Sequence, residues 1–119
     1  MVIRKQVNER MSRIVEYSGV IYLAGIVSDD KDLDIKGQAQ RVLAMAEERL
    51  AEAGSNKDHI LRAEIFVKDI ARDFAGFNEV WDAWVSKEQP PARACVEANM
   101  ASSNTLVEII FTAVKSRIL

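Results

Sequence analysis

The chain has 119 residues, 49% hydrophobic and 29% charged, a size and composition typical of one globular domain spanning 1–119. A net charge of −2 without a basic block argues against nucleic-acid binding, and the lack of a run of roughly 20 apolar residues argues against a membrane span. One cysteine and one histidine exclude an internal disulfide and a His- or Cys-rich zinc site, and we expect a cytoplasmic protein without a signal peptide.

Three strands are predicted before the first helix. Residues 2–7 alternate moderately between apolar and polar side chains, and Ser18-Gly19 is a turn signal between two apolar runs, which predicts a hairpin. The second run, 20–27, is apolar at almost every position. A strand with one face in water would alternate, so we expect this strand to be covered on both faces.

The middle of the chain switches between helical and extended patterns. Apolar residues at helical spacing predict a helix over 35–53, and Gly54 is expected to end it. The strand that follows is expected to place one set of apolar residues on a single face, namely Leu61, Ala63, Ile65 and Val67.

A second helix is predicted from Asp73, as its N-cap, to about residue 85. Its apolar stripe consists of Phe74, Phe77, Trp81, Trp84 and Val85. Asn78 lies on the same stripe, where an amide without a hydrogen-bond partner costs about 1–3 kcal/mol. A hydrogen bond from the helix to a loop is the structural interpretation of Asn78, and the pattern leaves a functional one open.

Two final strands, 92–98 and 106–115, complete the order strand, strand, strand, helix, strand, helix, strand, strand. This order predicts an α+β fold with a mixed sheet and both helices on one face. The second face then needs a cover that the chain lacks, since 20–27 is apolar throughout and Phe66 points away from Ile65. We therefore expect a homo-oligomer whose sheets pack against one another.

Arg93 is the first candidate functional residue, because Pro90 and Pro91 restrict the backbone in front of it. Its planar guanidinium can pair with a carboxylate through two parallel hydrogen bonds, and a surface or inter-subunit ion pair is the structural alternative. Cys95 lies two residues further and shares the strand face of Arg93. Because the only histidine, His59, is in a polar loop, a structural cysteine is a better interpretation of Cys95 than a nucleophile.

Glu108 is the second candidate, because it is the only charged residue in 105–114. It is expected to share a strand face with Leu106 and Ile110. A carboxylate in such a strand is either paired, for example with Arg93, or serves as a general base. The pattern alone leaves both interpretations open.

Four segments share their order and spacing with one known family, namely "VIYLAGIV", "AEERLAEAGSNKDHILRAEIFVKDIARDFAGFNEVWDAWV", "PPARACVEA" and "LVEIIFTAV". With them the chain resembles the RidA/YjgF family of reactive-intermediate deaminases, and most closely its YoaB-like branch. The resemblance implies a chorismate-mutase-like fold and a homotrimer whose sheets form an inner barrel, with active sites in clefts between subunits. It also implies hydrolysis of 2-imino acids or their enamine tautomers, such as 2-iminopropanoate and 2-iminobutanoate, to 2-keto acids and ammonia, without a cofactor or metal.

The resemblance also implies roles for individual residues. Arg93 matches the arginine that binds the substrate carboxylate, and Glu108 matches the acidic residue that orients or activates water. Cys95, Asn78 and Gly25 match residues of the cleft, Gly25 through its backbone amide. Two positions depart from the family: Ala24 replaces a hydroxyl residue just before that glycine, and Met11 falls near the family's N-terminal tyrosine. Both departures bear on substrate preference and on turnover.

An imine deaminase in which Arg93 and Glu108 border one crevice is therefore the favoured hypothesis. The alternative is a non-catalytic module that binds small carboxylates, such as 2-keto acids, in a cleft between subunits. A ribonuclease, a label that some members of the family carry, is disfavoured by the net acidity and by the lack of a histidine pair.

Overall fold

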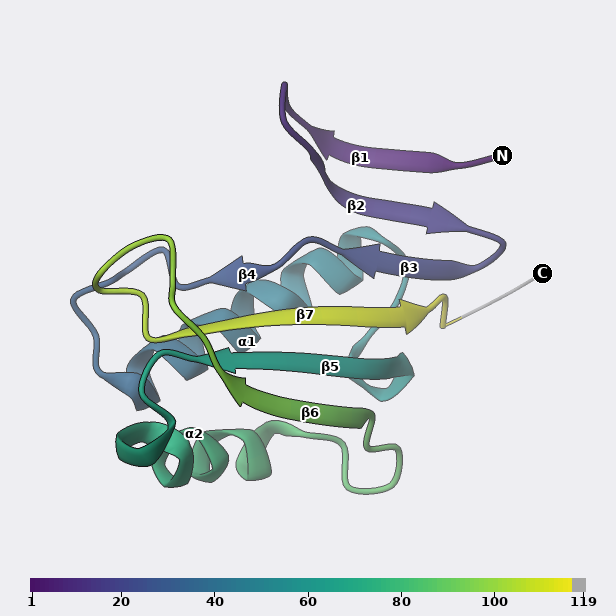
Figure 1. The fold of residues 1–119 in the computed structure, drawn as a ribbon. Coiled ribbons are helices and arrows are strands. Elements are labelled where there is room, and N and C mark those ends of the chain that lie inside the picture. The colour runs from purple at the N-terminus through teal and green to yellow at the C-terminus, as the bar shows by residue number, and fades with distance from the viewer. Residues whose placement is uncertain (117–119) are drawn as a thin grey trace.

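The computed structural model describes residues 1–116, which form a mixed sheet and two α-helices (Figure 1). The helices are α1 (Ile35–Glu52) and α2 (Ile70–Trp84), and a 3-10 turn, η1 (Lys57–His59), precedes β5. The strands are β1 (Ile3–Val7), β2 (Ser12–Tyr17), β3 (Val20–Leu23), β4 (Ile26–Val27), β5 (Ile60–Val67), β6 (Ala92–Glu97) and β7 (Val107–Val114). Their order in the sheet is β1-β2-β3-β7-β5-β6, with β4 paired to β7. β5 and β6 run parallel, and the other pairs are antiparallel, which confirms the predicted α+β class.

The predicted hairpin and first helix are confirmed, and their ends follow from local chemistry. Ser18 and Gly19 both have positive φ, 51° and 81°, as a tight turn between β2 and β3 requires. The Asp34 carboxylate accepts a hydrogen bond of 2.9 Å from the backbone N–H of Gly37 and so caps α1. Gly54, at φ 81°, lies just past the C-terminal end of α1.

The apolar run 20–27 forms two short strands instead of one, because it contains a β-bulge. Tyr22 pairs with Thr112, but Ile26 pairs with Ile109, so β3 and β4 together use one residue more than the facing stretch of β7. The extra residue shifts the alternation by one position between Leu23 and Ile26, and both side chains are buried. The bulge at Ala24 and Gly25 therefore accounts for part of the unbroken apolar pattern.

A second irregularity corrects the predicted face of β5. Ile60 pairs with Ala113 and Arg62 pairs with Thr112, so Leu61 is the extra residue of this pair of strands. Ile60 is buried in its place, whereas Leu61 is 48% exposed. The rest of the predicted face, from Ala63 onward, is buried as expected.

The start of α2 also differs from the prediction. Asp69 is the N-cap, because its carboxylate accepts from the backbone N–H of Arg72 at 3.1 Å. Asp73 lies inside the first turn, where it is buried and accepts two hydrogen bonds from the Arg72 guanidinium, at 3.0 and 2.9 Å. Asp73 takes a buried position on the helix, and Phe74, expected on the apolar stripe, is 42% exposed.

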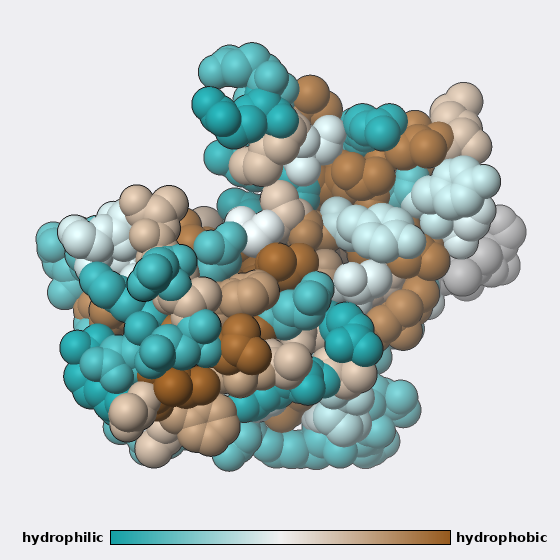
Figure 2. All heavy atoms as spheres, viewed as in Figure 1, coloured by the Kyte–Doolittle hydropathy of each residue, from teal (hydrophilic) through white to brown (hydrophobic). Residues whose placement is uncertain are grey.

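The hydrophobic core lies between the sheet and the two helices, and the opposite sheet face carries no cover within the described chain. Ile109 and Phe111 point from β7 into the core, and α1 crosses behind the strands (Figure 1). The uncovered face, called the open face below, consists of side chains including Val20, Tyr22, Val27, Phe66, Val96, Glu108, Ile110 and Thr112. Figure 2 shows this face toward the viewer, with hydrophobic residues across the strands and hydrophilic ones, such as Arg62 and Glu64, between them. Neither of the helices described within residues 1–116 has the length and apolar character that crossing a membrane requires.

Candidate functional site

Arg93 is held at the start of β6 by a neutral partner. Its Nη2 donates a hydrogen bond of 2.7 Å to Oδ1 of Asn78 on α2. Among residues 1–116 its guanidinium forms no ion pair with a carboxylate. The amide of Asn78 therefore binds a strand arginine and not a loop, and it fixes the guanidinium without neutralising its charge.

Two aromatic rings complete the surroundings of the arginine. The Cζ atom of Arg93 lies 5.8 Å from the ring centroid of Phe77 and 5.3 Å from that of Trp81, within the range of a cation–π contact. Both rings belong to the buried side of α2, and Trp81 stacks in turn on Phe111 of β7. Because these rings are packed in the core, they give the guanidinium a rigid support.

Cys95 is half-buried on the same strand face as Arg93 and packs against the core. Burial raises the pKa of its thiol, and the charge of Arg93 offsets this rise only in part. The thiol is therefore protonated at neutral pH, which fits a structural cysteine better than a nucleophile.

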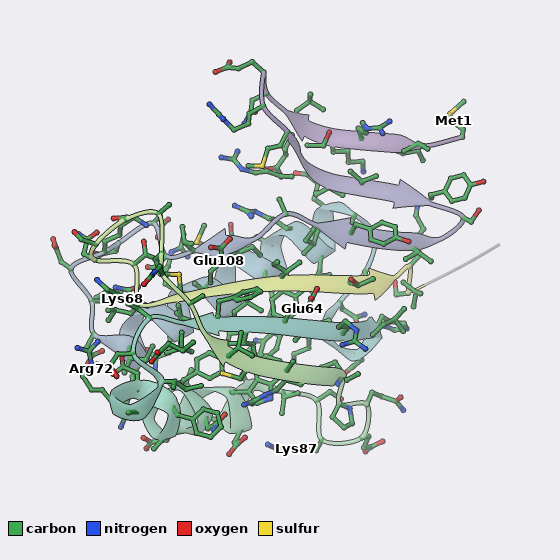
Figure 3. All side chains as sticks on the ribbon, viewed as in Figure 1. Met1, Glu64, Lys68, Arg72, Lys87 and Glu108 are labelled. Carbon is green, nitrogen blue, oxygen red and sulfur yellow. The ribbon has the colours of Figure 1, made fainter. Side chains whose placement is uncertain are left out.

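Glu108 lies on the open face, in close contact with the bulge. It is the Cα partner of Val27 on β4 and of Phe66 on β5, and it shares its face with Ile110, as expected. A Cβ atom added to Gly25 would stand 2.1 Å from Oε2 of Glu108, so the carboxylate lies directly against the glycine backbone. Figure 3 places Glu108 beside β4. Ala24, the other half-buried residue of the bulge, donates its backbone N–H to Arg13 O at 3.0 Å.

Within one chain, the site residues form two groups on opposite faces of the sheet. Arg93 is the Cα partner of Ala63, on the helix-covered face, whereas Glu108 faces the open side, and β5 separates their strands. Strand spacing and rise place the two Cα atoms roughly 14 Å apart. A single chain therefore provides no crevice bordered by both residues and no ion pair between them, because the alternation of the strands directs them to opposite sides.

A cleft of about 490 Å³ lies elsewhere, between the two helices, where Leu43, Val80 and Trp84 contribute to its walls. None of the predicted site residues lines it. Within residues 1–116, no three His, Cys, Asp or Glu side chains are grouped so that they could hold a metal ion. The groups around Arg93 and Glu108 are therefore separate from this cleft.

Comparison with known proteins shows the family of this chain. A family model described as Endoribonuclease L-PSP matches residues 4–115. A RutC family protein of Haemophilus ducreyi is 37% identical over 113 residues, which cover 95% of this chain and 96% of the relative. The crystal structure of NMB1025 from Neisseria meningitidis, a member of the YjgF protein family, matches with a TM-score of 0.95 and 41% identity, over 99% of this chain and 98% of that one. The chain belongs to the RidA/YjgF family.

The comparisons also support the resemblance to the YoaB-like branch of the RidA/YjgF family. The RutC family protein YoaB of Escherichia coli is 36% identical over 112 residues, which cover 94% of this chain and 96% of YoaB. The likeness therefore runs through both groups of site residues and is not confined to one motif. In fold, the two helices packed on a mixed sheet match the family's solved structures.

One polar residue near the site was missed in the sequence of this RidA/YjgF member. Gln38 lies on α1 between Ile35 and Ala39, on the buried side of the helix, and its side chain is 0% exposed. The feature that drew attention to Asn78, a polar residue on an apolar helical stripe, is also present at Gln38 and could have identified it. Its hydrogen bonds reach both loops that flank the Glu108 group.

Proposed function

We propose that this protein hydrolyses small 2-imino acids, such as 2-iminopropanoate and 2-iminobutanoate, to 2-keto acids and ammonia. The observation that carries the proposal is the guanidinium of Arg93, fixed by Asn78 at 2.7 Å and by two aromatic rings while unpaired with any carboxylate of residues 1–116. A cation held in this way is available for the carboxylate of a substrate. Arginine binds such a carboxylate with two parallel hydrogen bonds and so fixes its orientation as well.

The complete site is proposed to lie between subunits of a homotrimer. Arg93 of one subunit and Glu108 of its neighbour would then border one cleft, which the separation of these residues within a chain requires. The large apolar side chains of the open face support this arrangement, because those such as Phe66 and Ile110 gain burial when sheets pack together.

Once the substrate is oriented, its hydrolysis needs few groups from the protein. Water adds to the carbon of the C=N bond, and Glu108 takes the proton that the water loses, a general-base role typically worth about 10²–10⁴-fold in rate. The imine nitrogen gains a proton as the carbinolamine forms. A second proton then reaches this nitrogen while the hydroxyl group loses its own, so the C–N bond breaks to give ammonia and the 2-keto acid. The backbone at Gly25 lies beside the carboxylate that would direct the water.

The direct test is ammonia release from 2-iminopropanoate, generated in situ by an amino-acid oxidase, by wild-type protein and by Arg93→Ala. The proposal predicts loss of the acceleration in the variant and an unchanged oligomer. Arg49→Ala is the matched control, since Arg49 is a similarly half-buried arginine at the far end of α1. Equal release by wild type and Arg93→Ala would refute the assigned role of Arg93.

A second candidate is a non-catalytic module that binds 2-keto acids or similar carboxylates. The separation of Glu108 from Arg93 within the chain favours it, and so does Ala24, at a position where the family resemblance implies a hydroxyl. Calorimetric titration with pyruvate separates the candidates. Saturable binding that needs Arg93, without acceleration for imino acids of any chain length, would support the module and contradict the deaminase.

The matching family model carries the description Endoribonuclease L-PSP, which makes RNA cleavage a further activity to measure. The net charge of −2 and the single histidine argue against it, because phosphate backbones are bound by basic surfaces. RNA cleavage by the purified protein that disappears in Arg93→Ala would overturn this argument.

A further inference from the structure

Gln38 is the polar side chain of α1 that is fully buried, and all the hydrogen-bonding capacity of its NH₂ group is used. Nε2 donates to Leu33 O and to Asn104 O, both at 3.0 Å, and Oε1 accepts from the backbone N–H of Leu106 at 2.9 Å. A primary amide has two N–H donors, so neither is left over. Replacing this amide by an apolar side chain would remove all three hydrogen bonds at a position that is buried from water.

These bonds connect α1 to the two chain segments that build the Glu108 group. Leu33 lies in the loop after β4, the strand that pairs Val27 with Glu108. Asn104 and Leu106 lie at the end of the loop that enters β7, and Leu106 is two residues before Glu108. One amide therefore links α1 to the loop that follows β4 and to the loop that precedes β7.

The backbone of Leu106 is fixed from two directions. Its N–H donates to Gln38, and its carbonyl accepts from the backbone N–H of Lys68, just beyond β5, at 3.0 Å. The Lys68 ammonium also donates to Ser103 O in the same loop. Gln38 and Lys68 thus both hold the backbone immediately before β7.

We infer that Gln38 is a positioning residue for Glu108, acting through the backbone of Leu106 and the loops around it. This inference rests on the proposed function for its kinetic consequence, since it deepens the role given there to Glu108. None of the hydrogen bonds of Gln38 involves Arg93, which is held from α2 by Asn78. Loss of the amide should therefore disturb the step that Glu108 assists and leave carboxylate binding nearly intact.

The expected kinetic result is a separation of kcat from KM. Gln38→Met keeps the length and volume of the side chain but removes the donors and the acceptor. A misplacement of about 1 Å at a catalytic group can cost on the order of 10²-fold, so we expect kcat to fall by about 10- to 100-fold while KM changes by less than about twofold. Gln38→Glu, which keeps the acceptor for Leu106 N–H but loses the NH₂ donors, is expected to lower kcat as well.

Val42→Ala is the matched control for general destabilisation. Val42 is fully buried one turn further along α1, and its side chain offers no hydrogen bond to either loop. We expect it to lower the unfolding midpoint to a similar extent as Gln38→Met while kcat stays within about twofold of wild type. A Gln38→Met variant with wild-type kcat, or one in which the whole effect is on KM, would overturn the inference. Gln38→Glu gives the same test if the Met variant does not fold.

Amide hydrogen exchange measured by NMR tests the positioning role without any enzymatic assay. In wild type, the Leu106 N–H should be strongly protected. In Gln38→Met, its exchange should accelerate, and the resonances of Glu108 and Gly25 should shift while those of Arg93 stay in place. An unchanged Leu106 exchange rate in Gln38→Met would refute the positioning role even if the protein is a deaminase. If the wild-type protein releases no ammonia but Gln38→Met shows the expected exchange and resonance changes, only the proposed function is refuted.

Discussion

The carboxylate of Glu108 and the backbone of Gly25 occupy adjoining space at a β-bulge. A Cβ atom on Gly25 would lie 2.1 Å from Oε2 and 3.1 Å from Cδ of Glu108. Gly25 does not have a positive φ, so the glycine is required by this close approach and not by its backbone conformation. The position of the Glu108 carboxylate therefore depends on a residue without a side chain at position 25.

Gly25→Ala should displace the Glu108 carboxylate and lower kcat by about 10²-fold or more, close to the effect of removing a general base. The clash involves the end of a flexible side chain, so the free energy of unfolding should change by less than about 2 kcal/mol. Steady-state kinetics and chemical denaturation measure the two effects. Gly76→Ala on α2, where an added Cβ would meet Ile35 Cγ2 at 3.2 Å and two Lys36 side-chain carbons at 3.8 Å, is the control and should leave kcat unchanged. Equal kinetics for both alanine variants would contradict the role given to the contact.

In Asn78→Asp, the neutral amide that holds Arg93 is replaced by a carboxylate, which should compete with the substrate carboxylate for the guanidinium. A carboxylate in place of the amide, which now lies 2.7 Å from Nη2, would pair with the guanidinium. We expect KM for an imino acid to rise by about tenfold or more, with a protein at least as stable as wild type, because the ion pair must be broken by each substrate. Asn78→Ala, which removes the support without adding charge, should raise KM less. A smaller KM for the aspartate variant than for the alanine variant would contradict the binding of the substrate carboxylate by Arg93.

The Cys95 thiol should react slowly with alkylating reagents at neutral pH. Burial raises its pKa, so the thiolate fraction at pH 7–8 is below that of a free cysteine, and the reaction should accelerate only as pH rises above the ordinary thiol pKa. Mass spectrometry after iodoacetamide treatment at several pH values measures the rate, with protein unfolded in guanidinium chloride as the control. Complete labelling of the folded protein at pH 7, as fast as in the unfolded control, would show a reactive thiol instead.

A charge on the open face should break the assembly. Ile110→Asp places a carboxylate in the middle of the face that the proposed trimer buries. Light scattering after size-exclusion chromatography should give three times the chain mass of 13.3 kDa for wild type and a smaller mass for the variant. Ala83→Asp, on the exposed side of α2, is the control and should stay trimeric. A wild-type protein that is monomeric at micromolar concentration would defeat the proposed assembly.

The order of the elements could be predicted from the sequence because it depends on local patterns. The helix over 35–53, the turn at Ser18-Gly19 and the stop at Gly54 each follow from spacing or from backbone chemistry within a few residues. The irregularities could not be predicted in the same way. The extra residues at Ala24-Gly25 and at Leu61 are defined only by the partner strand, and β7 is far away in sequence from β3 and β4.

The site was predicted only in part for the same reason. The strand pattern places Arg93 with Cys95, and Glu108 with Ile110, but alternation within a strand does not tell which face two distant strands share. The pairing of β5 with both β6 and β7 decides it, and it puts Arg93 and Glu108 on opposite faces. Gln38 was missed because its hydrogen-bond partners are backbone groups of loops, and these partners cannot be read from the residue pattern of α1.

The central claim is that Arg93 of one subunit and Glu108 of another complete one site, and mixed oligomers test it most directly. Arg93→Ala and Glu108→Gln should each be inactive as pure oligomers. When the two chains are co-expressed and assemble at random, about one quarter of the shared sites should contain both intact residues, so ammonia release should return to about a quarter of the wild-type rate. Mixed oligomers, verified by mass spectrometry, that remain as inactive as their parents would contradict a site shared between subunits.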